Sequence, residues 1–193
     1  MRSESDGDGF RASRAALAGA RVAVTGVMLC GAAVTAQGIT REEALAAVYQ
    51  GADVRAEQVF LTPVQVKQAG ERAGTAVHSA LVARYIASRD GRTIGRAYVD
   101  THVVRTKNES LLISLDAVGR VLRIDVTAFL EPPEYRASEP WLRQYRGRGL
   151  TNDLAVNRAI RPIAGATLTG RAANDAVRRV LAIDQILTPE GGR

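Results

Sequence analysis

The sequence predicts an α+β fold, in which an antiparallel meander sheet is flanked by helices. After about residue 75, apolar and polar residues alternate with the period of a β-strand in several segments, and short turn signals separate these segments. Apolar residues at helical spacing come before this block and again near the end of the chain. Consecutive strands joined by short turns pair as antiparallel neighbours, and helices grouped at the ends of a strand block are typical of α+β proteins.

Two helices are expected before the sheet. Thr40 is followed three residues later by a glutamate, which is the spacing of a capping box, and Gly51 is expected to end the first helix. Thr62 precedes Pro63, so Thr62 is expected to cap a second helix that has the proline in its first turn. The segment 37–74 is therefore predicted to be helical.

Four strands are expected in the meander. The Asp90-Gly91 pair is a strong signal for a two-residue hairpin turn, and residues 116–119 predict a second turn. In the last strand, apolar residues alternate with Arg123 and Asp125, which is typical of a strand with one buried face. The expected strands are residues 80–86, 93–105, 111–115 and 121–129.

The composition indicates one globular domain with a targeting segment in front of it. Of the 193 residues, 46% are hydrophobic, which is enough for a core. Arg11, Arg14 and Arg21 precede an uncharged, largely apolar run at 22–36, and small residues before Gln37 fit cleavage by signal peptidase. Residues 1–36 are therefore predicted to be a signal peptide, or a retained short anchor, and the protein is expected to be exported.

The same composition argues against several classes of function. The net charge of +6 is spread along the chain without a block of like charges, so nucleic-acid binding is not expected. His78 and His102 are the only histidines, and neither has a second ligand-type side chain at the sequence spacing of a metal site, so no metal is expected. Cys30 is the only cysteine and lies in the predicted signal peptide, so a cleaved chain has no thiol.

Residues 163–170 read Ile-Ala-Gly-Ala-Thr-Leu-Thr-Gly and are the stretch best suited to carry chemistry. A helix is expected from about Arg171 to Leu187, so two hydroxyls lie just before it. A helix N-terminus has unpaired N–H groups and a partial positive charge, which suit a phosphate. Thr167 could carry a phosphate ester, and Thr169 is expected to cap the helix.

This segment resembles the flavinylation motif of FMN-binding domains. These domains occur in the sodium-translocating NADH:quinone reductase, in the Rnf electron-transport complex, and in exported single-domain relatives. The family motif runs Asp-x-x-Ser/Thr-Gly-Ala-Thr/Ser-x-Thr/Ser. Its core, Gly-Ala-Thr-x-Thr, is matched here by Gly165, Ala166, Thr167, Leu168 and Thr169.

Other parts of the chain resemble the same family in the same order. They are Gly95 and Tyr98 at the start of the sheet, an Asp-x-x-Gly-Arg turn within 113–121, the loop at 131–135, and a Trp-Leu-x-Gln-Tyr-x-Gly-Arg stretch at 141–148, which the resemblance implies is a helix. The resemblance covers about residues 75–187. Residues 75–193 are therefore expected to form a single FMN-binding-type domain.

The resemblance implies FMN as the cofactor and an electron carrier as the function. In the family, a flavin transferase joins FMN through its phosphate to the residue that corresponds to Thr167. The carrier would pass electrons between membrane redox partner proteins, in the periplasm or at the outer face of the cytoplasmic membrane. Glu131 and Tyr135 are expected near the isoalloxazine ring. Trp141 lies on the following helix, where it either contacts the cofactor or packs in the core.

An alternative function remains open. Arg161 stands where the family motif has Asp, and Ala164 stands where it has the first hydroxyl. These two differences favour a flavin-free or loosely flavin-binding interaction module of a respiratory or assembly complex. Arg161 is also a candidate partner for a phosphate, because it lies near Thr167 in the sequence.

Overall fold

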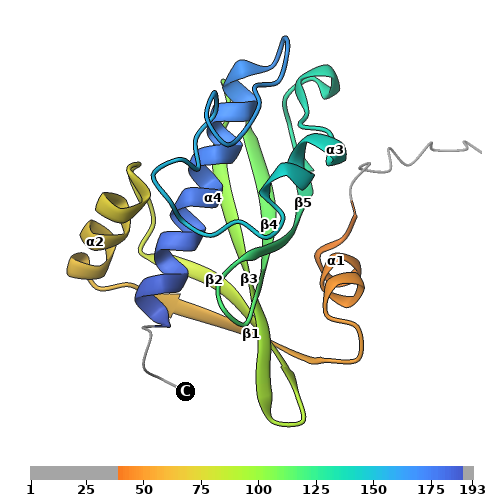
Figure 1. The fold of residues 1–193 in the computed structure, drawn as a ribbon, viewed down its shortest axis with the longest axis vertical. Helices are drawn as coiled ribbons and strands as arrows, with labels where there is room; N and C mark the ends of the chain where they lie inside the picture. The colour runs from red at the N-terminus through yellow and green to blue at the C-terminus, as the bar shows by residue number, and fades with distance from the viewer. Residues whose placement is uncertain (1–38, 189–193) are drawn as a thin grey trace, which may run out of the picture. The chain divides into compact units, whose positions relative to one another are not determined.

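A computed structural model describes residues 39–188, and its sheet has five antiparallel strands in the order β1-β2-β3-β4-β5, with helices beside it (Figure 1). The expected α+β meander is confirmed. The strands are β1 (Asp53–Phe60), β2 (Leu81–Arg89), β3 (Arg92–Val103), β4 (Asn108–Asp116) and β5 (Val121–Phe129). The helices are α1 (Arg41–Val48), α2 (Pro63–Ala73), α3 (Glu139–Leu142) and α4 (Thr167–Leu187), and two single 3₁₀ turns, Pro133–Tyr135 and Arg143–Tyr145, lie beside α3.

The predicted signal peptide, residues 1–36, lies outside the described residues. Within residues 39–188, no helix is long and apolar enough to cross a membrane.

Both predicted N-terminal helices are present and are capped as expected. Thr40 and Glu43 form a reciprocal capping box at the start of α1. Thr62 and Gln65 form a second one at α2, which has Pro63 at its first position. These short-range contacts explain why local sequence patterns located both helix starts.

The expectation that residues 37–74 are helical is wrong between the two helices. Residues 53–60 form β1, which pairs with β2 from Asp53 opposite Ser88 to Phe60 opposite Leu81. The segment is thus an integral part of the sheet. Charged residues fill alternate positions at the start of β1, and its β-branched and aromatic residues are Val54, Val59 and Phe60, which are too scattered to form the run that signals a strand.

The turn between β2 and β3 follows the sequence prediction. Asp90 and Gly91 have φ of 51° and 73°, the left-handed values that a tight hairpin needs. The β5 bounds also agree with the expected strand at 121–129. β4 is longer than expected, because Asn108 to Ser110 continue the pairing with β3.

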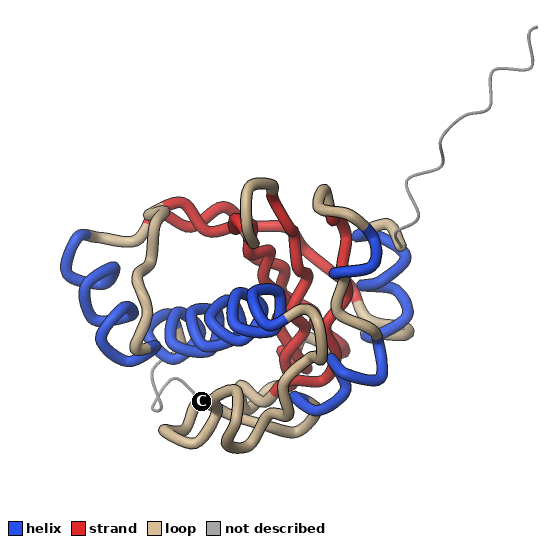
Figure 2. Tube along the Cα trace, turned by 90° about the horizontal axis from the view of Figure 1, so that it is seen from above, coloured by secondary structure: helices blue, strands red, loops and turns tan. Residues whose placement is uncertain are grey.

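Each face of the sheet is covered by a different helix (Figures 1 and 2). The long helix α4 packs on one face, with α2 beside it. The larger core lies there, and includes Tyr98, Leu111, Ile113, Leu115, Val177 and Leu181. Helix α1 packs on the opposite face, over a smaller core that includes Leu45, Tyr49, Ala87, Ala97 and Leu112.

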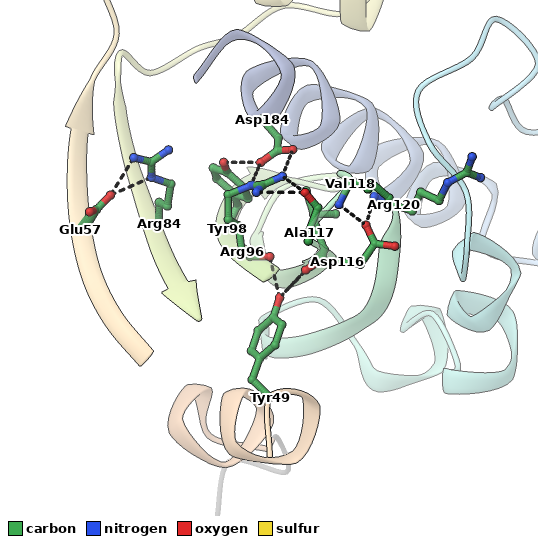
Figure 3. A network of polar contacts seen from close by, with 11 residues as sticks. Tyr49, Glu57, Arg84, Arg96, Tyr98, Asp116, Ala117, Val118, Arg120 and Asp184 are labelled. Carbon is green, nitrogen blue, oxygen red and sulfur yellow. Dashed lines mark hydrogen bonds and ion pairs between the residues drawn. The ribbon is translucent and has the colours of Figure 1, made fainter. Parts of the chain in front are cut away.

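Tyr49 anchors α1 to the sheet through its hydroxyl (Figure 3). The hydroxyl oxygen lies 2.7 Å from the carbonyl oxygen of Arg96 and 2.8 Å from that of Leu115, and the Leu115 N–H donates to it. The ring lies against Gly95, where an added Cβ would be only 2.4 Å from the Tyr49 ring. The sheet therefore needs a glycine at this position.

A buried ion pair fixes the C-terminal half of α4 to β3 (Figure 3). Asp184 accepts from Nε of Arg96 at 2.5 Å and from the Tyr98 hydroxyl at 2.7 Å. All three side chains are buried, so the charges compensate each other away from water. This contact sets the position of α4 along the sheet, and with it the position of the helix N-terminus.

The helix expected from Trp141 to about residue 148 is much shorter than predicted. Helix α3 ends at Leu142, a single 3₁₀ turn follows, and Gly147 has a left-handed φ of 76°. Gly147 and Arg148 instead exchange backbone hydrogen bonds with Val121, the first residue of β5. The chain here pairs with the outer edge of β5 at its first residue.

Candidate functional site

A pocket of about 350 Å³ opens at the N-terminus of α4. Its lining brings together three regions that are far apart in the sequence, namely the β3–β4 loop, the 3₁₀ turn Pro133–Tyr135 and the predicted motif. The lining residues are Arg105, Tyr135, Gly165, Ala166, Thr167, Leu168 and Thr169. All five motif residues named from the sequence therefore line one pocket, together with Tyr135.

Thr167 is the first residue of α4 and its side chain is exposed. Ala166 occupies the N-cap position, and no side chain makes a capping hydrogen bond there. The N–H groups of the first turn thus lack a side-chain partner, which leaves the partial positive charge of a 21-residue helix available to an anion. A hydroxyl and an anion-attracting helix end lie at the same place.

The expectation that Thr169 caps the helix is wrong. Thr169 is the third residue of α4 rather than the residue before it, and only 1% of it is exposed. Helix α4 begins four residues earlier than the sequence suggested, which moves Thr167 from the cap region into the first turn. Of the two hydroxyls, only that of Thr167 is accessible.

Gly165 makes the turn that leads into α4. Its φ is +77°, which non-glycine residues rarely adopt, and a Cβ added there would meet nothing within 4 Å. The backbone is therefore open to a bound group on this side. Leu168, 49% exposed, adds an apolar side chain to the same lining.

Arg105 is a site residue that sequence reasoning missed. Its guanidinium carbon lies 5.2 Å from the centre of the Tyr135 ring, in a cation–π contact. Both side chains line the pocket, so it has a cation held on an aromatic ring beside the Thr167 hydroxyl. The sequence places Arg105 at the end of an expected strand, 62 positions before Thr167, and no local signal connects them.

Glu131 shapes the site without lining it. Its Oε1 atom accepts from the backbone N–H groups of Thr106, Lys107 and Arg105, at 2.6, 2.8 and 3.2 Å. These backbone donors, that of Thr106 first, hold the pKa of Glu131 below its usual value. The carboxylate therefore fixes the loop that presents Arg105.

Trp141 packs behind the site and is not among the pocket-lining residues. Its indole N–H donates to the Arg161 carbonyl oxygen at 2.7 Å. Its ring meets Tyr145 edge to face and lies 3.6 Å from where a Cβ on Gly170 would be. Trp141 thus supports the turn before α4 and the start of the helix.

Arg161 does not line the pocket either. Its backbone N–H donates to Gln144 and its carbonyl oxygen accepts from Trp141. The basic side chain that the pocket does contain is that of Arg105.

A second polar cluster lies under α4 and is not connected to the predicted motif. His102 lies 2.9 Å from Asp100 and 3.1 Å from Glu109, and Asp100 also pairs with Arg179 of α4. Burial would lower the pKa of His102, but the hydrogen bonds to Asp100 and Glu109 outweigh it and raise the pKa to about 9. The same contacts outweigh the effect of burial on Asp100 and lower its pKa to about 2.

The two partners of His102 were missed in the sequence, because only spacings typical of metal ligands were considered there. Asp100 lies two residues away on the same face of β3, and Glu109 lies directly opposite on β4. Among residues 39–188, no group of histidine, cysteine and carboxylate side chains is arranged to hold a metal ion. With Arg179 paired to Asp100, the His102 cluster is an ion-pair network that joins β3, β4 and α4.

The pocket therefore combines an accessible hydroxyl, a helix N-terminus, a guanidinium and an aromatic ring. This set of groups suits a molecule with a phosphate and a planar ring. No protein-family model matches the chain, and neither a curated protein nor a solved structure matches it.

Proposed function

We propose that this domain is an exported electron-transfer flavoprotein that carries FMN as a phosphoester on Thr167. One observation carries the proposal: the only accessible hydroxyl of the Gly-Ala-Thr-x-Thr stretch opens into a pocket that also contains Arg105 and Tyr135. A buried Thr167, or a start of α4 without a pocket, would have counted against it.

The groups that line the pocket fit both parts of FMN. The phosphate is a dianion in free FMN and a monoanion once it is esterified to Thr167, and in both forms it would be attracted by the N-terminus of α4 and by the Arg105 guanidinium. The ring system needs a planar and largely apolar slot, for which Tyr135 and Leu168 supply surface. At about 350 Å³ the pocket lies near the lower end of the range of roughly 300–1,000 Å³ typical of small-molecule sites.

Attachment requires an activated donor and a separate enzyme. The donor would be a flavin dinucleotide, in which a phosphoanhydride bond joins the FMN phosphate to a nucleoside monophosphate. The Thr167 oxygen would form a bond to the phosphorus of FMN and lose its proton to a base, while the phosphoanhydride bond breaks and the nucleoside monophosphate leaves. The pocket contains no carboxylate or histidine to remove that proton. A flavin transferase would therefore supply the base and the donor site, and this domain would supply the acceptor hydroxyl.

Once bound, FMN would supply the redox chemistry, because an isoalloxazine ring accepts and releases electrons. The residues of the chain would hold and orient it. The open pocket leaves the ring accessible to redox partners at the membrane, as a carrier requires. The alternative, an interaction module without flavin, is supported by Ala164 and Arg161 in place of the motif's hydroxyl and Asp.

The direct test is to coexpress the chain with a flavin transferase and examine flavin fluorescence in a denaturing gel. Wild type and Thr169→Val are expected to give a fluorescent band, and Thr167→Val is not. Thr169→Val is the matched control, since it removes a hydroxyl two residues away. Fluorescence that survives Thr167→Val would refute attachment at this residue, and a dark wild-type band would favour the flavin-free alternative.

A second test distinguishes binding of FMN in the pocket from attraction of FMN by the general positive charge of the surface. Arg105 and Lys107 are both exposed and lie in the same loop, but only Arg105 lines the pocket. Arg105→Gln is expected to weaken reversible binding of free FMN to the Thr167→Val chain, measured by quenching of FMN fluorescence. Lys107→Gln is expected to have little effect. Equal losses in the two variants would mean that surface charge alone attracts the flavin.

A further inference from the structure

The outer edge of β1 is an open edge of the sheet. Within residues 39–188, the backbone of β1 pairs only with β2. The pairing with β2 continues without a register shift over all eight residues, and β1 contains no proline. The opposite edge of the sheet is different, because Gly147 and Arg148 bond to Val121 and Arg136 donates to Val126.

The edge of β1 can attract another strand, because its outward N–H and C=O groups are unpaired. Natural proteins protect such edges with bulges, prolines, charged side chains or a covering segment, and within residues 39–188 β1 has only charged side chains, of both signs. At the end of β1, Phe60 is 73% exposed and its neighbour Leu81 is 45% exposed. Two apolar side chains therefore lie together beside an unpaired backbone edge.

The charges on β1 alternate in sign, so they can pair with those of a second β1 strand that runs antiparallel to it. Asp53, Arg55 and Glu57 lie on one face of β1, because side chains alternate along a strand. Glu57 pairs with Arg84 of β2 at 2.8 Å, and Arg55 reaches Glu57 at 2.5 Å while 71% of its side chain remains exposed. Arg55 is thus available to a second carboxylate.

The charges and the length of β1 together select one register for pairing two β1 strands. Centring on Val54 would place Asp53 opposite Arg55, but only residues 53–55 of the two strands would then pair, whereas centring on Ala56 pairs residues 53–59. A continuous sheet with a two-fold axis requires that odd-numbered residues face odd-numbered residues. Pairing centred on Arg55 places two arginines opposite each other, and pairing centred on Glu57 does the same with two glutamates. Centring on Ala56 places each Arg55 opposite the Glu57 of the other strand, where cross-strand pairs of opposite charge are favourable.

We propose that two copies of this chain associate through antiparallel pairing of their β1 edges, with Ala56 on the two-fold axis. The two sheets then form one continuous sheet across the interface, and Phe60 lies diagonally opposite Val54 of the second copy. The pairing satisfies the open backbone groups of β1 and covers part of the exposed Phe60 side chain. The inference does not depend on FMN, because β1 contributes nothing to the pocket.

Disulfide trapping tests the proposed register. Directly opposite residues in an antiparallel pair have Cα atoms about 4.5–5.5 Å apart, which is within the range that a disulfide spans. In the full chain with Cys30→Ser, Ala56→Cys is expected to give a covalent dimer under mild oxidation. Gln58→Cys is the matched control and is expected to remain uncrosslinked, because residue 58 lies opposite residue 54 in this register.

Sedimentation of the variants tests the charges. Arg55→Glu alone and Glu57→Arg alone are each expected to sediment as monomers, since each places like charges opposite each other. A mixture of the two variants is expected to form a heterodimer, because the charges are then complementary again. Circular dichroism verifies that each variant is folded, and Ala56→Cys trapping serves as the test if Glu57→Arg unfolds through loss of its pair with Arg84.

Three results would overturn the proposal. They are a wild-type chain that sediments as a monomer up to its solubility limit, a dimer that Arg55→Glu leaves intact, and equal crosslinking of Ala56→Cys and Gln58→Cys. None of these results would affect the test of FMN attachment at Thr167.

Discussion

Replacing His102 by glutamine is expected to destabilise the protein in a pH-dependent way. His102 lies between Asp100 and Glu109, and only 8% of its side chain is exposed. Glu109 is fully buried and its Oε1 atom has no hydrogen-bond partner, so the positive charge of His102 compensates a carboxylate that water does not reach. Glutamine keeps polar atoms at this position but removes the charge.

The size of the effect follows from the pKa of His102, which is raised from 6.5 to about 9 in the folded protein. A pKa difference of one corresponds to about 1.4 kcal/mol, so protonation of His102 stabilises the folded state by about 3 kcal/mol. Because the folded-state pKa is the higher one, this contribution is complete below pH 6.5. It falls as the pH rises and is lost above about pH 9.

Urea unfolding of wild type and His102→Gln at a series of pH values measures this contribution. The difference in unfolding free energy is expected to be about 3 kcal/mol near pH 6 and to shrink steadily toward pH 9.5. Taking the difference removes the titration of the groups that do not interact with His102. Asp100 does interact with it, but the pKa of Asp100 is about 2 in wild type, well below the pH range of the measurement. A difference that stays constant with pH, or an NMR titration that places the pKa of His102 near 6.5, would refute the reasoning.

Two further substitutions test the fold and the loop of the site. Gly95→Ala is expected to lower the free energy of unfolding, measured by thermal or urea unfolding, by about 1–3 kcal/mol, because the new Cβ would lie 2.4 Å from the Tyr49 ring. An unchanged stability would show that the ring is not held against the strand. Glu131→Ala is expected to speed hydrogen exchange of the amides at 105–107, which lose their shared acceptor, and to weaken binding of free FMN. Exchange at wild-type rates would mean that the loop holds its shape without the carboxylate.

The elements with short-range determinants were predictable from the sequence. The capping residues Thr40 and Thr62 and the Asp90-Gly91 turn each act over a few residues, and each is present as expected. Strand β1 was not predictable, because its strand-forming residues are scattered among charged ones and its structure comes from pairing with β2, whose partner residues lie 21 to 35 positions later. The short α3 was also missed, since its end depends on contacts between Gly147 and β5.

The candidate site was predictable in part. The motif at 165–169 and Tyr135 were named from the sequence, and they line one pocket. The role of Thr169 differs from expectation, because α4 starts at Thr167. Trp141 packs in the core behind the start of the helix, which is one of the two positions expected for it. Arg105 could not be identified, because only the folded sheet brings the β3–β4 loop to the helix N-terminus.

Mass spectrometry of the exported chain, coexpressed with a flavin transferase, tests the central claim most directly. Attachment through a phosphoester predicts an intact mass raised by that of FMN less one water, and fragmentation of the peptide spanning 163–170 is expected to place the added mass on Thr167 rather than Thr169. An unmodified mass, or an addition at any other residue, would contradict the account.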